Sequence, residues 1–498
     1  MSDPVDDAYA LVGQGRAAEA LPLIEPAARR AGATHAELAA HAEVLRALGR
    51  KEEALEVYRR ALAIAPQSPI AEHNLASVLA DLSLYPEAEA AARRAFAKGL
   101  NAAETWLVLA HALEAQGRLD EAEAAYGEVL RRRPEMLRAQ RDLAQLIWMR
   151  TGDADASAAN LMALHRADPA NPMVAAQLAT VLRFAGKLET AYEIVISSLA
   201  RTTGSRLELE LVGASLAAQL KESVAASRHA EEALRIAPED ARAVIAAADG
   251  HLGLGRPGPA ARLAESLLER DPADQAALSR LATAWRLMDH PRYGELYDYG
   301  AMVRGYRLTT PQGWPTLDAY LAELAQALRA AHLVTGEPFD QSLRGGSQTH
   351  TDLSRMEAPA VKALFQAIEG PIREHMEALG PGEDALRRRG TGAYRVQGAW
   401  SVRLRPEGFH VNHIHQNGWL SSALHVELPP AVADEGRREG WLKFGEPGIA
   451  TQPALPPEHF VRPEPGRLVL FPSYMWHGTQ PFGGEQDRLT VAFDVVPA

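Results

Sequence analysis

Three histidines near the end of the chain have the spacing of metal ligands. His413 and His415 stand two residues apart in a run with strand character, so both imidazoles should leave the same face of a pleated strand. His477 follows on a later predicted strand, whereas His410 should point to the opposite face from His413. The chain has no cysteine, so a metal must be held by His, Asp or Glu. The pattern predicts a metal site made of His413, His415 and His477.

An arginine on the last predicted strand suggests an organic acid beside that metal. Arg488, Thr490 and Ala492 alternate onto one face, which should be the metal face of the sheet. A buried guanidinium without a partner is costly, and a carboxylate matches it in a bidentate fork that a hydroxyl can extend. No acid nearby in the sequence obviously serves as the partner. Arg488 and Thr490 are therefore predicted to bind the carboxylate of a bound organic acid.

Short strands with turns between them should position these side chains. Strands are expected at residues 394–404, around the histidine run, and at 419–428, 441–444, 467–471 and 488–496. Such a series at the end of a chain favours a double-sheet jelly roll, that is, a double-stranded β-helix, with a metal in its open mouth. Flanking helices are expected at 317–332 and 358–379. The glycine-containing stretch 336–349 is expected to be a polar loop over the site, with Arg344 and Gln348 as substrate or lid contacts.

The first part of the chain is a repeat array. A turn glycine or a substitute recurs every 34 or 35 residues, at Gly15, Gly49, Ser83, Gly117, Gly152, Gly186, Lys221 and Gly255. Five residues beyond each turn stands a small side chain, at Ala20, Ala54, Ala88, Ala122, Ser157, Ala191, Ala226 and Ala260. Prolines that should end the second helix of a repeat follow at Pro66, Pro134, Pro169, Pro238 and Pro272.

This pattern resembles the tetratricopeptide repeat, with residues 104–137 as a representative copy. The resemblance implies an all-α superhelix of about eight stacked repeats whose concave groove binds a protein or peptide. A structural or dimerising role for the array is the alternative, which leaves homo-oligomer formation open. A capping helix is expected at 275–288. We therefore divide the chain into a repeat array at 1–290 and a sheet domain at 291–498.

The amino-acid composition argues against two classes of partner, nucleic acids and membranes. The formal net charge of −12 argues against a nucleic-acid partner, because phosphate binding needs clustered positive charge. No stretch approaches the roughly 18 consecutive apolar residues of a membrane span, and the acidic N-terminus lacks the basic and apolar regions of a signal peptide. The expectation is a cytoplasmic protein with no membrane partner.

The C-terminal part resembles the Fe(II)/2-oxoglutarate-dependent oxygenases, and most closely those that carry N-terminal tetratricopeptide repeats. The order of the matching segments carries the resemblance: 340–349, 400–422, 440–448, 465–478 and 487–493. It implies Fe(II), 2-oxoglutarate as co-substrate and O2, with iron on His413 and His477 and the distal carboxylate of 2-oxoglutarate on Arg488, assisted by Thr490. His415 stands where the wider superfamily has aspartate, and Leu424 and His425 stand where paired tyrosines are expected.

Three functions fit this sequence. The first is a dioxygenase that hydroxylates a side chain of a protein or peptide held by the repeat groove. The second is a repeat scaffold whose oxygenase domain is degenerate and non-catalytic, which the change to His415 permits. The third is a cupin-like metal enzyme, because Gly466 and Pro472 ahead of His477 resemble a cupin motif; however, a cupin gives no reason for Arg488.

Overall fold

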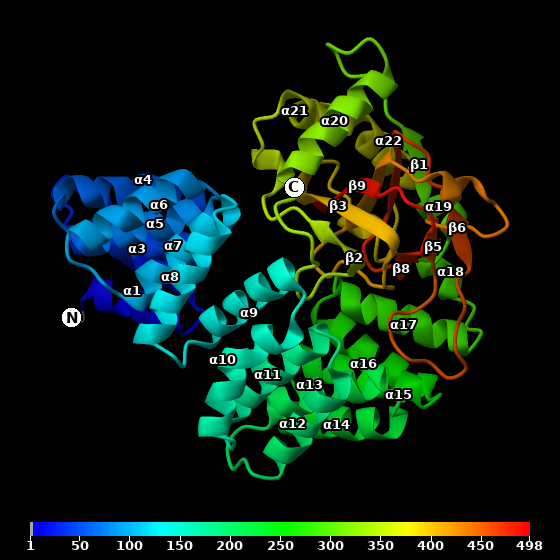
Figure 1. Ribbon diagram of the computed structural model, residues 1–498, viewed down its shortest axis with the longest axis horizontal. Coiled ribbons are helices and arrows are strands. Elements are labelled where there is room, and N and C mark those ends of the chain that lie inside the picture. Colours follow the sequence, from blue (N-terminus) through cyan, green and yellow to red (C-terminus); the bar gives the residue numbers. More distant parts are fainter. Residues whose placement is uncertain (1–2) are drawn as a thin grey trace. The chain divides into compact units, whose positions relative to one another are not determined.

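The computed structural model describes residues 3–498 and forms two compact units, one ending at Leu146 and the other spanning Ile147–Ala498 (Figure 1). The first unit is helical throughout, and each helix packs against the next one in the chain. Its helices are α1 (Pro4–Gly13), α2 (Ala17–Ala28), α3 (His35–Ala47), α4 (Lys51–Ile64), α5 (Pro69–Asp81), α6 (Tyr85–Ala97), α7 (Ala103–Ala115) and α8 (Leu119–Arg132). The next helix, α9 (Leu137–Thr151), begins in the first unit and ends in the second.

The second unit continues the repeats and then changes to strands with flanking helices. Its repeat helices are α10 (Ala154–Ala167), α11 (Pro172–Phe184), α12 (Leu188–Leu199), α13 (Leu207–Gln219), α14 (Ser223–Ile236), α15 (Ala241–Gly253), α16 (Pro257–Arg270) and the predicted capping helix α17 (Gln275–Leu287). The later helices are α18 (Tyr293–Leu296), α19 (Tyr299–Met302), α20 (Leu317–Ala331), α21 (Pro359–Ala367) and α22 (Glu369–Leu379), with 3₁₀ turns at Leu353–Arg355, Arg387–Arg389 and Pro430–Ala433. Because one compact unit contains both kinds of structure, the domain boundary at residue 290 remains a prediction.

The residues that define the repeat have the predicted structural roles. The eight small side chains five residues beyond the turns are all buried, so one helix can approach its neighbour closely at each of them. The five prolines each lie two residues beyond the end of a helix. All eight turn residues have positive φ, and the two substitutes, Ser83 at 59° and Lys221 at 65°, adopt the conformation of the glycines. Since helices of this length are marginal alone, packing between successive helices must supply their stability.

Two antiparallel sheets form the C-terminal part. The strands are β1 (Arg304–Arg307), β2 (Leu343–Gln348), β3 (Tyr394–His410), β4 (Leu420–Glu427), β5 (Leu442–Phe444), β6 (His459–Val461), β7 (Arg467–Pro472), β8 (His477–Thr479) and β9 (Arg488–Pro497). The larger sheet has the order β1-β7-β4-β9-β3-β2 and the smaller one the order β6-β5-β8. Every pairing is antiparallel. The description of this arrangement as a jelly roll remains a prediction.

One hydrophobic core joins the last repeats to the sheets. It includes side chains of α16 and α17, of α20 to α22, and of the central strands β4, β7 and β9. Trp476 is part of this core and donates its indole N–H to the Thr283 hydroxyl of α17 at 3.0 Å. The residue that follows is His477, so the end of the repeat array helps to fix the backbone that carries a predicted ligand.

Two sequence expectations about secondary structure were wrong. Residues 336–349 are not simply a loop, because Leu343–Gln348 pairs with β3 as strand β2. Adjacent glycines hide the strand pattern: a Cβ on Gly346 would lie 2.4 Å from the Arg403 carbonyl oxygen, and Gly345 has φ of 70° where the register shifts. The histidine run is also not a regular strand, since β3 ends at His410 and His413 forms only an isolated bridge.

Candidate functional site

Backbone hydrogen bonds bring the three predicted histidines together. His413 and His477 form a two-way bridge, with N–H···O distances of 2.9 and 3.1 Å. The His415 N–H donates to the Ser473 carbonyl at 3.0 Å, so the segment after β3 lies along the β7–β8 connection. The predicted convergence is therefore correct, although its cause is this irregular pairing and not the alternation of one strand.

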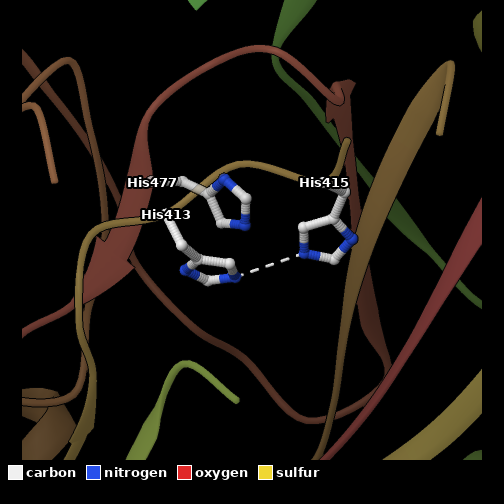
Figure 2. A group of neighbouring side chains, drawn as sticks. All are labelled: His413, His415 and His477. Carbon is white, nitrogen blue, oxygen red and sulfur yellow. Dashed lines mark hydrogen bonds between the residues drawn. The ribbon is translucent and has the colours of Figure 1, made fainter. Parts of the chain in front are cut away.

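The three imidazoles point toward a common centre (Figure 2). One ring nitrogen from each of His413, His415 and His477 lies within 4.8 Å of the others. The Nε2 atoms of His413 and His415 are 3.2 Å apart. Two nitrogens bound to one ion at about 2.1 Å, with a right angle between the bonds, would lie about 3 Å apart. The observed spacing matches that arrangement.

Hydrogen bonds on the far side of each ring determine which nitrogen is free. His413 Nδ1 lies 2.8 Å from the Val411 carbonyl oxygen, and His477 Nδ1 lies 2.9 Å from the Met475 carbonyl oxygen. Because a carbonyl only accepts, both Nδ1 atoms must carry hydrogen. His415 Nδ1 lies 2.6 Å from Asp494 Oδ1, and an ionised carboxylate likewise only accepts. All three Nε2 atoms are then left with a lone pair.

When all three imidazoles are neutral, this tautomer makes the short contact between His413 and His415 repulsive unless a cation lies between them. Two Nε2 lone pairs 3.2 Å apart have no hydrogen to share, whereas a positive ion between them would bind both. Burial, together with the neighbouring His415, lowers the pKa of His413 to about 3. Burial, together with His413 and His415, also lowers the pKa of His477 well below its ordinary value. Both rings are thus neutral near pH 7, as metal ligands must be.

Arg488 has the isolated environment expected from the sequence. It opens β9, is 2% exposed, and forms no ion pair within residues 3–498. Its Nε and Nη1 atoms are buried without a hydrogen-bond partner in this part of the chain, and its Nη2 atom lies 3.4 Å from His425 Nδ1. Burial lowers the pKa of Arg488 to about 10. A charge held in this way is costly unless an anion joins it.

The histidines and Arg488 line one cavity of about 610 Å³. That volume is within the range of roughly 300–1,000 Å³ typical of small-molecule sites. Thr490 and Gln348 also line this cavity, and the Thr490 hydroxyl donates to the Val402 carbonyl at 3.5 Å. Arg344 does not belong to the cavity lining, because its guanidinium donates to the backbone carbonyls of Gln341 and Leu343. As part of a paired strand, Gln348 forms a wall of the cavity and not a free lid.

Sequence reasoning missed three residues of the site. Asp494 lies on the same face of β9 as Arg488, and extending the alternation by one step beyond Ala492 would have found it. Arg183 and Phe184, at the end of α11, also line the cavity. No local signal distinguishes them from other residues of the repeats, since their position depends on the packing of the whole unit.

Comparison with known families agrees with both sequence resemblances. Residues 398–494 match the family described as "Putative 2OG-Fe(II) oxygenase". Tetratricopeptide-repeat models match residues 35–78, 73–128 and 107–172. The chain thus carries tetratricopeptide repeats and a C-terminal domain of this oxygenase family. No curated protein matches the chain significantly.

Three of the solved structures that match show low similarity, and each covers about half of this chain. Yeast Tom70 gives a TM-score of 0.45 at 16% identity and covers 56% of this chain and 60% of that one. A tetratricopeptide repeat protein from Parabacteroides merdae gives 0.36 at 17% identity, over 49% of this chain and 96% of that one. Naa15/Naa10 bound to HypK-THB gives 0.27 at 22% identity, over 50% and 39%. Within residues 3–498 no helix is long and apolar enough to cross a membrane.

Proposed function

We propose that the protein is an Fe(II)- and 2-oxoglutarate-dependent dioxygenase that hydroxylates a side chain of a protein or peptide. The observation that carries this proposal is the buried, unpartnered guanidinium of Arg488 in the same cavity as three converging histidines. The match of residues 398–494 to the oxygenase family supports it. In this proposal the sheets form a jelly roll and the protein is cytoplasmic.

The three histidine side chains are suitable ligands for Fe(II). His413, His415 and His477 would bind it through Nε2, because each Nδ1 is committed to an oxygen. Three protein ligands leave room on a six-coordinate ion for a chelating 2-oxo acid and for O2. When bound, this group supplies oxidation coupled to the decarboxylation of 2-oxoglutarate to succinate. The protein supplies the ligands, the orientation and a cavity of restricted access.

Arg488 would bind the distal carboxylate of 2-oxoglutarate. Its Nε and Nη1 donors are free, and each lies on a different edge of the guanidinium that it shares with Nη2. A carboxylate can bind one of these edges through two parallel N–H···O bonds. Thr490, on the same face of β9, can add its hydroxyl. His425 contacts the remaining Nη2 atom and helps to orient the guanidinium from the position where a tyrosine was expected.

Asp494 gives a reason to prefer the active enzyme over the degenerate scaffold. The change from aspartate to His415 removes a carboxylate from the ligand set, yet Asp494 places one against the far side of that same imidazole. Such a carboxylate fixes the ring orientation and makes the imidazole a stronger donor. The cupin-like alternative leaves Arg488 unexplained. The repeat array would hold the polypeptide substrate, as such arrays commonly bind protein segments.

Turnover without added substrate tests this function. Protein purified without oxygen is mixed with Fe(II) and 2-oxoglutarate labelled in the carbons that become succinate, and O2 is then admitted. The proposal expects labelled succinate from the wild-type chain and much less from His477→Ala. Absence of succinate at every iron and 2-oxoglutarate concentration would favour the scaffold.

A further inference from the structure

The repeat array supplies part of the wall of the oxygenase cavity. Arg183 and Phe184, the last two residues of α11, line it together with residues of the sheet domain. The array therefore reaches the place where the reaction is proposed to occur.

The Arg183 guanidinium lies over the ring of Phe184, and its N–H groups make no hydrogen bond within residues 3–498. Its guanidinium carbon lies 4.1 Å from the centre of the Phe184 ring, which stacks on Phe339 at 5.4 Å. Stacking uses the face of a guanidinium, whereas its N–H groups lie in the plane around the edge. In the same part of the chain the carboxylate nearest to these N–H groups, that of Asp340, is 3.9 Å away. Burial lowers the pKa of Arg183, although Asp340 opposes this effect.

The charged residues that line the cavity indicate that Arg183 can bind an anion other than 2-oxoglutarate. Two arginines, Arg183 and Arg488, and two acids, Asp340 and Asp494, line it. Asp494 is already bound by His415 and by the Ser421 hydroxyl at 2.8 Å. In the proposed function one carboxylate of 2-oxoglutarate lies on the metal and the other on Arg488. Asp340 forms an ion pair with Arg183 at 3.9 Å, which is beyond hydrogen-bond distance, so the Arg183 N–H groups can still donate to a further carboxylate.

We propose that Arg183 binds an acidic side chain of the polypeptide substrate, so that the substrate segment carries an aspartate or glutamate within reach of the metal centre. This inference rests on the proposed function, which assigns 2-oxoglutarate to the metal and Arg488 and so leaves Arg183 for the substrate. A free guanidinium edge on an aromatic surface fits a carboxylate in the bidentate geometry. Phe184, which is partly exposed and lines the cavity, gives the neighbouring apolar part of the segment a surface to pack against.

A peptide array tests this proposal directly. Many peptide sequences are each made in three versions that differ only in a central Glu, Gln or Lys, and the labelled full-length protein is applied with Fe(II) and 2-oxoglutarate in the absence of O2. Arg183→Gln and Arg183→Glu are compared with Arg201→Gln, whose arginine is an exposed residue of the same array outside the cavity. Loss of a charge-assisted pair corresponds to roughly a 10- to 100-fold change in affinity.

The wild-type protein should bind the Glu versions more tightly than the Gln and Lys versions, and Arg201→Gln should keep this preference. Arg183→Gln should reduce the preference by at least about tenfold, and Arg183→Glu should bind the Lys versions best. No preference for Glu, or a preference that survives Arg183→Gln, would overturn the proposal. Equal competition by free glutamate would overturn its polypeptide part. Succinate formation measured without peptide tests the oxygenase itself, so failure of the activity and failure of this inference give different results.

Discussion

The Asp494 carboxylate lies 2.6 Å from Nδ1 of His415, on the side of the ring opposite His413. Asp494 also accepts a hydrogen bond from the Ser421 hydroxyl at 2.8 Å, and Ser421 contacts Ser473 at 2.9 Å. These contacts hold the carboxylate in place against His415. In the proposed iron site, the carboxylate would lie one imidazole away from the metal.

Asp494→Asn should weaken metal binding while leaving the three histidines in place. The amide can keep a hydrogen bond to His415 but removes the charge, and loss of such a partner typically costs about 10- to 100-fold in metal affinity. Titration with Co(II), followed by its visible absorption and by chelator competition, measures the change. Asp487→Asn is the matched control, because Asp487 pairs with Arg403 and not with a histidine. Equal Co(II) affinity in wild type and Asp494→Asn would show that the carboxylate does not act on the metal.

Arg488→Met should not destabilise the ligand-free protein. The guanidinium is buried with two unpartnered nitrogens, so its replacement by an apolar side chain removes a desolvated charge. Such replacements are often neutral or stabilising by about 1–4 kcal/mol. Thermal unfolding without ligand should give a midpoint equal to or above that of wild type, and 2-oxoglutarate with metal should no longer raise it. A loss of stability of about 2 kcal/mol or more, the cost of breaking a satisfied charged contact, would mean that Arg488 already has a partner.

His332 should make stability depend on pH below neutrality. It joins the end of α20 to Ser347 of β2 at 2.8 Å and to Ser401 of β3 at 3.2 Å. Burial, with help from nearby Arg403, lowers the pKa of His332 to about 4. The unfolded chain therefore binds this proton first, so the contribution is complete above about pH 6.5 and is lost as the pH falls toward 4.

Urea unfolding of the metal-free protein between pH 7 and pH 4 measures this dependence. His332→Gln should reduce the slope of unfolding free energy against pH by up to about 1.4 kcal/mol per pH unit relative to wild type. Parallel curves for the two proteins would contradict the assignment.

Two substitutions at turn residues of the repeats should change the free energy of unfolding in opposite directions. Gly186→Ala should destabilise the second unit by about 1 kcal/mol, because a residue with a Cβ is strained at φ of 76° even though no atom lies within 4 Å of the new methyl. Lys221→Gly, at φ of 65°, should stabilise it by a similar amount. Chemical denaturation of both variants measures the two effects. Changes of the same sign would show that φ does not determine the preference at these turns.

The features that could be predicted from the sequence are those that depend on a regular repeat spacing or on the alternation of side chains along a strand. The repeats follow from turns such as Gly117 and terminators such as Pro134, and Arg488 follows from strand alternation together with the cost of a buried charge. The histidines were found by their chemistry, although the strand assumed for His415 was wrong. The structure shows that the residues taken from the oxygenase resemblance share one cavity, and their roles remain predictions.

Other features depend on packing that has no local signature. Strand β2 was missed because Gly345 and Gly346 break the alternation of side chains, yet the absence of a Cβ is what lets β2 lie against β3. Arg183 was missed because it is one arginine among many on the repeat helices. Only the docking of α11 against the segment around Phe339 brings it to the cavity.

The central claim is that iron and 2-oxoglutarate bind together, through the histidines and Arg488. Anaerobic titration of the Fe(II)-loaded protein with 2-oxoglutarate, followed by the ultraviolet–visible band of the iron–oxoacid chelate, tests it most directly. The wild-type chain should develop the band at saturation, and His413→Ala should not. Arg488→Ala should require more 2-oxoglutarate, by an affinity loss of about 2 kcal/mol or more. A wild-type protein that binds Fe(II) but never shows the band, or an Arg488→Ala variant with unchanged affinity, would contradict this account.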